Sequence, residues 1–339
     1  METPMTRQRA TLSRRGFLSG SACLLAAPAL SATGEELRFE HVYGETVLPA
    51  PAKRVVSLGY NTQDALLALG IAPIGLRYWY GDYPHGVWPW AQELLGDAEP
   101  TVMTGEVSIE TVASLAPELI VASGSGISQA EYALLSQIAP VLLQDPAHST
   151  YGSPWDVELR RIGRATGTSD RAEQLIADLR GRFAAMREAH PDWQGRSAVC
   201  AWHDGGQTGA FMGGDTRAQF LSELGFRAPD ALSAMQVIDG FYTSLSPEDL
   251  SPIDADLLIW ISSDARAGDI ATLAMRRTLA AYAEGREVFC GELMAGALSF
   301  GSVLSMPFAL EHLEAEFAAA LDGDPGTLVP SAEAAGLRK

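Results

Sequence analysis

Residues 108–121, SIETVASLAPELIV, line up without gaps against residues 246–259, SPEDLSPIDADLLI, so the chain carries two copies of one pattern. Each copy opens with a serine that can cap a helix and an acid in the first turn, where the helix dipole favours negative charge. Each copy ends in a run of strand length that is apolar on both faces, as in a parallel sheet. The pattern predicts a short helix leading into a buried strand in each half of the chain.

A second match begins each half, where RVVSL at residues 54–58 and RSAVC at residues 196–200 both read as opening strands. A helix ending at glycine follows each of them, because glycine readily adopts the left-handed conformation at a helix C-terminus. These helices are expected at residues 64–70 and 218–225. Further helices are expected at 131–138, 270–282 and 307–321, strands at 141–144 and 288–290, and a hairpin at 37–48.

The longest helical pattern in the chain, residues 155–190, lies between the two halves and is interrupted at residues 167–170. Its second part has a single apolar stripe over about 21 residues, or roughly 30 Å at 1.5 Å per residue. That length equals the width of a domain. One helix is therefore expected to cross from one half to the other.

Together these patterns predict an α/β protein of two similar lobes with mostly parallel sheets, joined by one long helix, with a ligand cleft between the lobes. The expected division is residues 1–32 as a signal peptide, 33–150 as the N-terminal lobe, 151–194 as the helical linker, 195–321 as the C-terminal lobe and 322–339 as a flexible tail. The tail follows from the turn formers at residues 322–326.

The N-terminal residues read as an export signal. SRRGFL at residues 13–18 resembles the twin-arginine motif, and the mildly apolar run at 17–30 is too short to span a bilayer. The segment predicts export to the periplasm or the exterior of the cell envelope.

The charge of the chain excludes several partners. The formal net charge is −18, and removal of residues 1–32, which hold four basic residues and one acid, makes it −21. Such a field repels phosphate backbones and anionic lipid, so nucleic-acid binding is not expected.

The nucleophiles and metal-binding residue types form no catalytic pattern. After removal of the signal only Cys200 and Cys290 remain, which allows at most one disulfide. The histidines lack ligand spacing, the glycine-rich pieces lack the lysine of a phosphate loop, and no Gly-x-Ser-x-Gly motif occurs. His203 and Asp204 are the nearest approach to a catalytic pair. We expect a protein that is not an enzyme and has no metal site or cofactor.

Several segments in a fixed order carry a resemblance to a known family. They are PAKRVVSL at residues 51–58, LALGIAPIG at 67–75, the two Ser-x-Glu stretches quoted above, and SFGSVLSMP at 299–307. With them the chain resembles the periplasmic siderophore and cobalamin receptors of ABC importers, over roughly residues 37–321. The resemblance implies a monomeric substrate-binding protein that delivers an iron-siderophore complex to an ABC permease dimer in the inner membrane. A cobalamin or haem receptor, or a ligand sensor not coupled to transport, are the alternatives.

In that family one acid on each lobe meets an arginine pocket of the permease. Glu110 and Glu248 fall on the matching positions of the two repeated stretches. The resemblance therefore implies permease docking by this pair. As an alternative, both acids only stabilise helix starts, a contribution of a few tenths of a kcal/mol, on the order of 0.3.

Ligand contacts are expected in the loops that follow the strands, because ligands of open α/β sheets lie at the C-terminal strand ends. The segment RYWYGDYPHGVWPW at residues 77–90 is dense in aromatic residues that can hold an organic ligand. These rings can instead pack the loop onto its lobe, and Arg217 can instead pair with Asp215 or Glu223. The candidate residues are Tyr60, Arg77, Tyr78, Trp79, Tyr80, Trp202, Arg217, Tyr242 and Phe300.

One part of the family pattern is missing. Hydroxamate receptors of this class often have an arginine just before the first Ser-x-Glu and an aromatic residue after the following strand. Here Thr104-Gly105 and Ser123-Gly124-Ser125 occupy these places. The departure leaves catecholate, mixed-ligand, cobalamin or haem cargo open beside a ferric hydroxamate.

Overall fold

The computed structural model of the protein describes residue 1, residues 36–264 and residues 266–337. The predicted twin-arginine motif and the apolar run behind it lie outside these described residues. Residues 35–339 form one compact unit.

The N-terminal lobe is built on a five-stranded parallel sheet of order β5-β4-β3-β6-β7. The predicted hairpin at residues 37–48 is present as the antiparallel pair β1–β2. It is tied to the sheet because the Thr46 hydroxyl donates to the Val141 carbonyl at 2.6 Å. The strands are β1 Leu37–His41, β2 Gly44–Leu48, β3 Val55–Ser57, β4 Gly75–Arg77, β5 Thr101–Met103, β6 Leu119–Val121 and β7 Val141–Leu142; the helices are α1 Thr62–Ala68, α2 Gln92–Leu95, α3 Ile109–Ser114 and α4 Gln129–Leu135, with a 3-10 turn at Pro84–Gly86.

The C-terminal lobe has a five-stranded sheet of order β10-β9-β8-β11-β12. Strands β8, β11 and β12 run parallel, whereas β9 is antiparallel to both of its neighbours. Its strands are β8 Ala198–Asp204, β9 Gln207–Phe211, β10 Tyr242–Leu245, β11 Leu257–Ile261 and β12 Glu287–Cys290; its helices are α7 Thr216–Glu223, α8 Asp230–Ser233, α9 Ala267–Ala271, α10 Ala280–Ala283, α11 Glu292–Phe300, α12 Ser305–Ala320 and α13 Pro330–Ala334, with 3-10 turns at Ser251–Ile253 and Met275–Thr278.

The two sheets place their strands in the same order along the chain. In each, the first strand is central, the next two lie to one side and the last two to the other. The copies differ at the second strand, because Gly205 and Gly206, with φ of +58° and +78°, close a two-residue hairpin that reverses β9. The prediction of two similar lobes with mostly parallel sheets is confirmed, with this single reversed strand.

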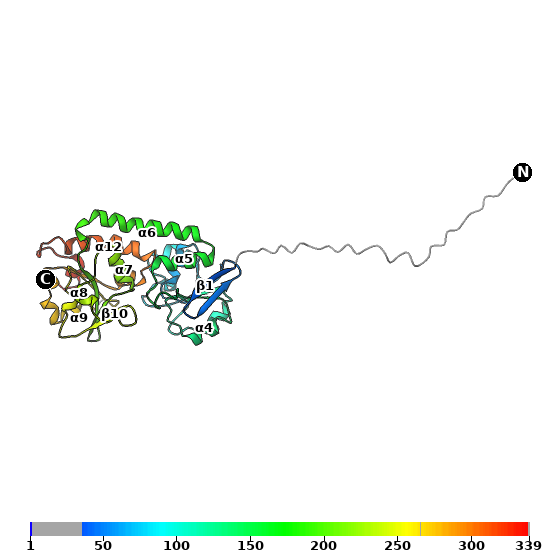
Figure 1. The fold of residues 1–339 in the computed structure, drawn as a ribbon, viewed down its shortest axis with the longest axis horizontal. Helices are drawn as coiled ribbons and strands as arrows, with labels where there is room; N and C mark the ends of the chain where they lie inside the picture. The colour runs from blue at the N-terminus through cyan, green and yellow to red at the C-terminus, as the bar shows by residue number, and fades with distance from the viewer. Residues whose placement is uncertain (2–35, 265, 338–339) are drawn as a thin grey trace. The chain divides into compact units, whose positions relative to one another are not determined.

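Two helices join the lobes. Helix α5 (Trp155–Thr166) ends at Gly167, and α6 (Ser169–Ala189) then runs along both lobes, as Figure 1 shows. Near its start α6 packs on α5, and further along Phe183 meets Phe220 of α7 edge to face at 5.7 Å between ring centroids. The long crossing helix predicted from the apolar stripe is present.

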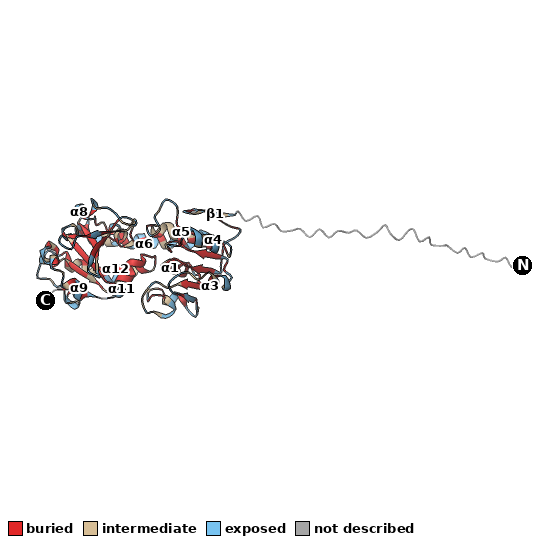
Figure 2. Cartoon of the chain, turned by 90° about the horizontal axis from the view of Figure 1, so that it is seen from below, coloured by how far each residue is buried: buried red, intermediate tan, exposed pale blue. Residues whose placement is uncertain are grey.

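The apolar core is continuous from one lobe to the other. One cluster of buried side chains includes Val55 and Leu119 of the first sheet, Ile162 of α5, Phe183 of α6 and Ile259 of the second sheet. Figure 2 shows the buried residues filling the strands of both sheets and the helix faces against them. A shared core favours small relative movements of the lobes over wide ones.

The second copy of the repeat does not contain the expected helix. Residues 246–249 form a tight bridge and turn, and a 3-10 turn follows at Ser251–Ile253. Pro252 explains the difference, since a proline inside the expected helix lacks the amide hydrogen that helix continuation needs. Glu248 therefore lies in an exposed turn, whereas Glu110 lies in the first turn of α3.

Three other local expectations were wrong. The helix expected at 270–282 is broken into α9, a 3-10 turn and α10. Phe300, expected in a loop, is the last residue of α11. The end of the chain is not loose up to residue 337, since Val329, Ala332 and Leu337 are buried and Arg276 donates to the Leu337 carbonyl at 2.7 Å. The turn formers at 322–326 reverse the chain without detaching it.

The cysteines are free and buried on the two neighbours of β11. Cys200 on β8 is level with Ile259, and Cys290 on β12 is level with Ile261. With about 4.8 Å between adjacent strands, two thiols separated by a strand are too far apart to form a disulfide. Burial raises the pKa of both thiols.

A buried carboxylate lies where the N-terminal lobe meets the loop between α11 and α12. Ser302 Oγ and Trp90 Nε1 both donate to Asp64 Oδ2, at 2.6 and 2.7 Å. Beside them, Asn61 Nδ2 donates to the Phe300 carbonyl at 2.7 Å. Burial raises the pKa of Asp64 from 3.8 to about 6, opposed by the two hydrogen bonds. We call this contact the seam.

The raised pKa of Asp64 predicts a pH-dependent stability. Between pH 3.8 and about 6 the folded protein binds more protons at this group than the unfolded chain, so its contribution to stability falls as pH rises. The loss is on the order of 3 kcal/mol. Asp64→Asn keeps an acceptor for Ser302 and Trp90 and removes the charge. The free energy of unfolding of this variant minus that of wild type is expected to be larger at pH 7.5 than at pH 4. Both are measured by urea unfolding.

Asp97→Asn at an exposed position makes the same change of net charge and serves as the control. It is expected to follow the wild-type pH dependence. If the stability of Asp64→Asn also follows the wild-type pH dependence, ionisation of Asp64 does not cause that dependence.

Candidate functional site

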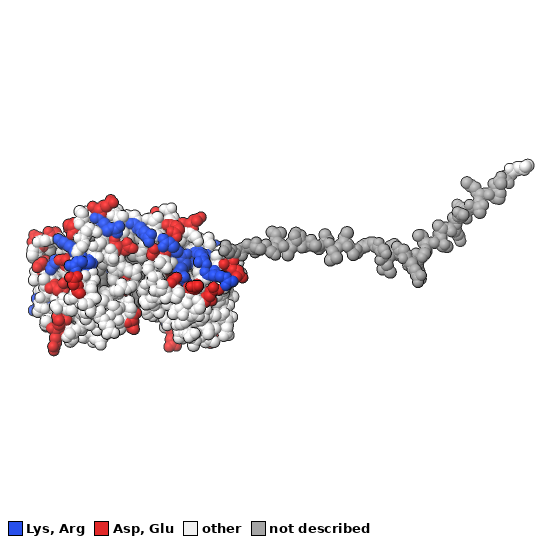
Figure 3. All heavy atoms as spheres, viewed as in Figure 1, with Lys and Arg blue, Asp and Glu red and all other residues white. Residues whose placement is uncertain are grey.

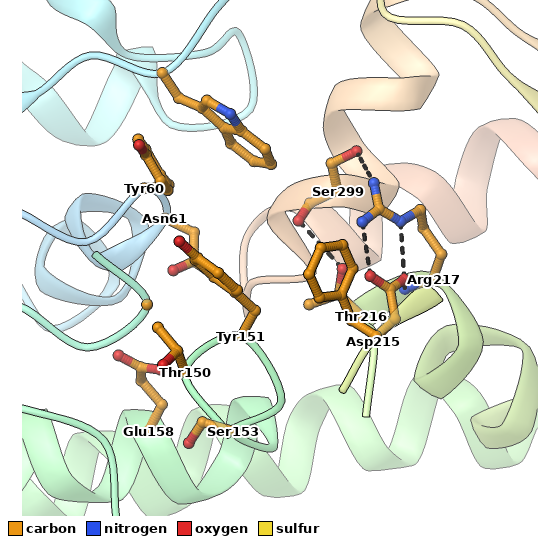
Figure 4. Close-up of a pocket in the computed structure, with 13 residues that line it drawn as sticks. Tyr60, Asn61, Thr150, Tyr151, Ser153, Glu158, Asp215, Thr216, Arg217 and Ser299 are labelled. Atoms are coloured by element: carbon orange, nitrogen blue, oxygen red, sulfur yellow. Dashed lines mark hydrogen bonds and ion pairs between the residues drawn. The ribbon is translucent and has the colours of Figure 1, made fainter. Parts of the chain in front are cut away.

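A cavity of about 300 Å³ lies between the lobes. It is formed at the C-terminal ends of β3, β4 and β6 of the first sheet, the segment after β7, and the starts of α7 and β10 and the end of α11 in the second lobe. Figure 4 shows these side chains pointing toward one space. The lining residues are Tyr60, Asn61, Trp79, Gly124, Thr150, Tyr151, Ser153, Glu158, Asp215, Thr216, Arg217, Phe241 and Ser299.

Tyr60 and Trp79 form an aromatic wall on the N-terminal lobe. Their ring centroids lie 5.2 Å apart, and Trp79 keeps 37% of its surface exposed. The Arg77 guanidinium lies over the Tyr60 ring at 4.7 Å and donates to the carbonyls of Gly105 and Ser125. Exposed, well-supported rings are surfaces on which an organic ligand can pack.

Trp88 and Trp90 of the aromatic segment pack next to the seam instead of lining the cavity. Trp88 is 1% exposed and stacks on Trp90 at 5.0 Å. It also meets Phe300 of the other lobe at 5.5 Å, and a Cβ on Gly296 would come within 2.4 Å of its ring. Of the rings in this segment, Trp79 lines the cavity, whereas Trp88 and Trp90 pack between the lobes.

The cation of the second lobe is fully engaged by its neighbours. Arg217 Nε and Nη2 donate to the two oxygens of Asp215 at 2.8 and 2.7 Å, and Nη1 donates to Ser299 Oγ at 2.8 Å. The guanidinium also lies 3.5 Å from the Phe211 ring centroid. Asp215 in turn caps α7 by accepting from the Arg217 amide. Arg217 pairs with Asp215, the first of the structural partners considered for it.

Glu158 brings an acid to the opposite side of the cavity. Its Oε1 is buried and has no hydrogen-bond partner among the described residues, and the same holds for the Ser153 hydroxyl beside it. Burial raises the pKa of Glu158 from 4.5 to about 7, opposed by Ser123 and Arg161. The side chain projects from α5 into the cavity (Figure 4).

The structure brings three of the nine candidate ligand residues to the cavity. Tyr60, Trp79 and Arg217 line it. Arg77 supports Tyr60 from outside the lining, and Tyr80 and Phe300 contact Trp79 at 4.8 and 5.6 Å. Tyr78, Trp202 and Tyr242 are not among the residues that line it.

The loop after β7 was missed by the sequence reasoning. It supplies Thr150, Tyr151 and Ser153, and α5 adds Glu158. The strand-end rule, applied to the last strand of the lobe, points to this loop. A lobe boundary drawn at residue 150 assigned it to the linker instead.

The two candidate docking acids are both exposed, one on each lobe. Among the described residues neither Glu110 nor Glu248 forms an ion pair; Glu110 only accepts a 3.5 Å hydrogen bond from Ser108. On the face drawn in Figure 3, basic side chains gather along α5 and α6, and the opposite edge shows acidic ones. Both acids are thus free to meet a partner of positive charge.

The pair considered for catalysis lies elsewhere. His203 Nδ1 is 2.8 Å from the Thr208 hydroxyl and Asp204 pairs with Arg266 at 2.9 Å, and neither lines the cavity. The described residues contain no group of three or more acids, histidines or cysteines that could hold a metal ion. Within the same residues, every helix is too short or too polar to cross a membrane.

Comparison with known proteins gives consistent matches. A model of the periplasmic binding protein family matches residues 55–292. The probable siderophore-binding lipoprotein YfiY of Bacillus subtilis is 28% identical over 226 residues, which cover 64% of this chain and 66% of that protein. The Fe(3+) dicitrate-binding periplasmic protein FecB of Escherichia coli is 31% identical over 135 residues, or 40% of this chain and 42% of that protein. The chain thus spans about two thirds or less of these relatives' length.

Among solved structures, a periplasmic solute binding protein from Mycobacterium smegmatis is 33% identical, with a TM-score of 0.73. The match covers 84% of this chain and 99% of that chain.

Proposed function

The chain belongs to the periplasmic binding protein family, and from this premise we propose that it binds a ferric siderophore outside the cytoplasmic membrane and delivers it to an ABC importer. The observation that carries the proposal is the cavity between the lobes, with the half-buried ring of Tyr60 and the exposed ring of Trp79 on one side and residues of the second lobe on the other. A ligand held there contacts both lobes at once. Its binding therefore favours the closed arrangement.

Binding takes place without chemical change of the ligand. The aromatic wall packs against the organic body of the chelate, and Asn61, Thr150 and Ser299 offer polar contacts at its edges. The ligand carries the iron, so the protein needs no metal ligands of its own. A cobalamin or haem complex would use the same wall.

Transfer to the importer depends on the two exposed acids. We assign Glu110 and Glu248 to docking on the two halves of a permease dimer, one lobe to each half. The α5–α6 connection and the shared core act as a strut that limits closure, so the permease separates the lobes to release the ligand. The chain reaches this location by a twin-arginine signal in residues 1–32 and acts as a monomer.

Direct binding tests the function. The chain without residues 1–32 is titrated with ferric siderophores, a corrinoid and haem, and binding is followed by native mass spectrometry and by quenching of tryptophan fluorescence. Saturable one-to-one binding of a ferric siderophore, with loss of its uptake after gene deletion, is expected. Binding without any effect on uptake indicates a sensor, and binding of the corrinoid or haem alone indicates the other cargo.

Trp79→Ala is expected to lower the affinity for the bound chelate about tenfold, because a stacked aromatic ring contributes roughly 1 kcal/mol beyond its buried area. Affinity is measured by isothermal titration calorimetry. Leu134→Ala on α4 is the control, since Leu134 is 49% exposed and lies outside the cavity lining. Equal affinities of the two variants contradict a role of the aromatic wall.

A further inference from the structure

The charges around the cavity restrict the kind of ligand that fits. Three lining residues carry formal charge: Glu158, Asp215 and Arg217. Asp215 holds Arg217 by two hydrogen bonds, and Ser299 takes a third donor of the guanidinium. The positive charge is therefore neutralised inside the protein. Glu158 is left as the one acid of the described lining without a counterion there.

The neighbouring arginines do not enter the cavity lining, although the charge of Arg161 opposes the burial that raises the pKa of Glu158. Arg77 is held behind Tyr60 by two backbone carbonyls. Arg161 donates to the carbonyls of Glu40 and Leu143 and lies 3.4 Å from Asp145. Neither of them is among the residues that line the cavity. An anionic ligand would find no free cation in the described lining and would face the Glu158 carboxylate.

Glu158 is also equipped to receive a donor. Its Oε1 and the neighbouring Ser153 hydroxyl are the lining oxygens that are buried and lack a hydrogen-bond partner among the described residues. Buried polar atoms in native proteins almost always have partners, so an oxygen that lines a cavity without one marks a place for a ligand group. An N–H or O–H of the ligand supplies what this oxygen lacks.

Resting on the proposed function, we propose that the cavity selects ferric chelates without net negative charge, and that Glu158 accepts a hydrogen bond from an N–H, O–H or ammonium group of the chelate. Ferric trihydroxamates are the chemical class that fits, because three singly charged hydroxamates cancel the charge of Fe³⁺. Tris-catecholate and citrate complexes keep several negative charges and are disfavoured. The arginine that hydroxamate receptors often have, and that this chain lacks, is a contact to the bound chelate. The charges of the lining determine instead which chelates are repelled.

The test compares four chelates on the chain without residues 1–32. Ferrichrome is uncharged, ferrioxamine B carries an ammonium group, and ferric dicitrate and ferric enterobactin are anionic. Calorimetric titration at pH 8, where Glu158 is mainly ionised, is expected to show both hydroxamates binding at least 100-fold more tightly than both anionic complexes. Glu158→Gln is expected to lower the affinity for ferrioxamine B about tenfold more than that for ferrichrome, and to raise the affinity for ferric dicitrate.

Glu93→Gln on α2 makes the same change of net charge at an exposed position outside the cavity and is the control. Equal or tighter binding of an anionic chelate by the wild type overturns the charge selection while leaving the proposed function intact. Unchanged relative affinities in Glu158→Gln overturn the role of Glu158. Binding of none of the four chelates overturns the proposed function itself, and this inference with it.

Discussion

Glu110→Lys combined with Glu248→Lys is expected to abolish ligand uptake while leaving ligand affinity unchanged. Both side chains are exposed, lie on different lobes and have no ion pair among the described residues. Removing one partner of a charge pair buried at an interface costs about 2–5 kcal/mol, and reversing its sign adds repulsion. Reversing both contacts is therefore expected to weaken the affinity for the permease by about a thousandfold or more. Each single variant is expected to lose only part of the uptake, because the other lobe still docks.

Uptake is measured with radioactive iron in cells that lack the native gene and express each variant, and affinity with the purified proteins. A matched control reverses Glu93 and Glu311, also one exposed acid on each lobe, and changes the net charge equally. This control separates docking from the overall field of the protein. Normal uptake by the Glu110→Lys, Glu248→Lys protein would exclude the pair from docking.

Arg217→Met is expected to destabilise the protein by about 3–5 kcal/mol, because it leaves the buried Asp215 carboxylate without its counterion. Arg217 and Asp215 have side chains only 11% and 4% exposed, and the pair carries the α7 N-cap. The double variant Asp215→Asn, Arg217→Met removes both charges and keeps a capping side chain. It is expected to recover much of the lost stability, measured as the midpoint of guanidinium unfolding.

Arg227→Met is the comparison for this prediction. Arg227 pairs with Asp230 at 2.9 Å, but the two side chains are 53% and 94% exposed, so the loss is expected to stay below about 1 kcal/mol. A similar small loss in Arg217→Met would mean that solvent reaches Asp215 and compensates for the missing guanidinium.

The architecture was predictable because it rests on patterns that are local or repeated. Apolar runs with a helix and a glycine around them recur in both halves, and both sheets have the same strand order. The stripe that predicted the crossing helix includes Ile176, Leu179 and Phe183, all buried. Periodicity carries such information because each element must bury its apolar face wherever the chain takes it.

The errors arose where a short signal competed with a longer one. Gly205-Gly206 is a hairpin signal of two residues, and the match between the halves, in which a helix follows the opening strand, left the strand after it unpredicted. Pro252 prevents the second repeated helix, although the rest of the stretch resembles the first copy. In both places the local backbone preference of one or two residues decided the structure.

The site was only partly predictable, because contacts between distant segments decide it. The sequence located Tyr60, Trp79 and Arg217, yet it does not reveal that Trp88 packs against Gly296 more than 200 residues away. Nor does the sequence show whether Arg217 is held by Asp215, the N-cap residue of the same helix, or is free for a ligand. In the sequence Glu158 is an ordinary residue of an amphipathic helix. Only the structure shows that it lines the cavity together with the loop that precedes the helix.

The position of the two cysteines makes lobe movement accessible to spectroscopy. Both thiols are buried on either side of β11, and burial keeps them in the unreactive protonated form. In a chain that lacks residues 1–32, new cysteines on exposed sites of the two lobes can therefore be labelled with maleimide dyes while the native ones stay in place. Energy transfer between the dyes then reports, molecule by molecule, how far the lobes approach when a chelate binds.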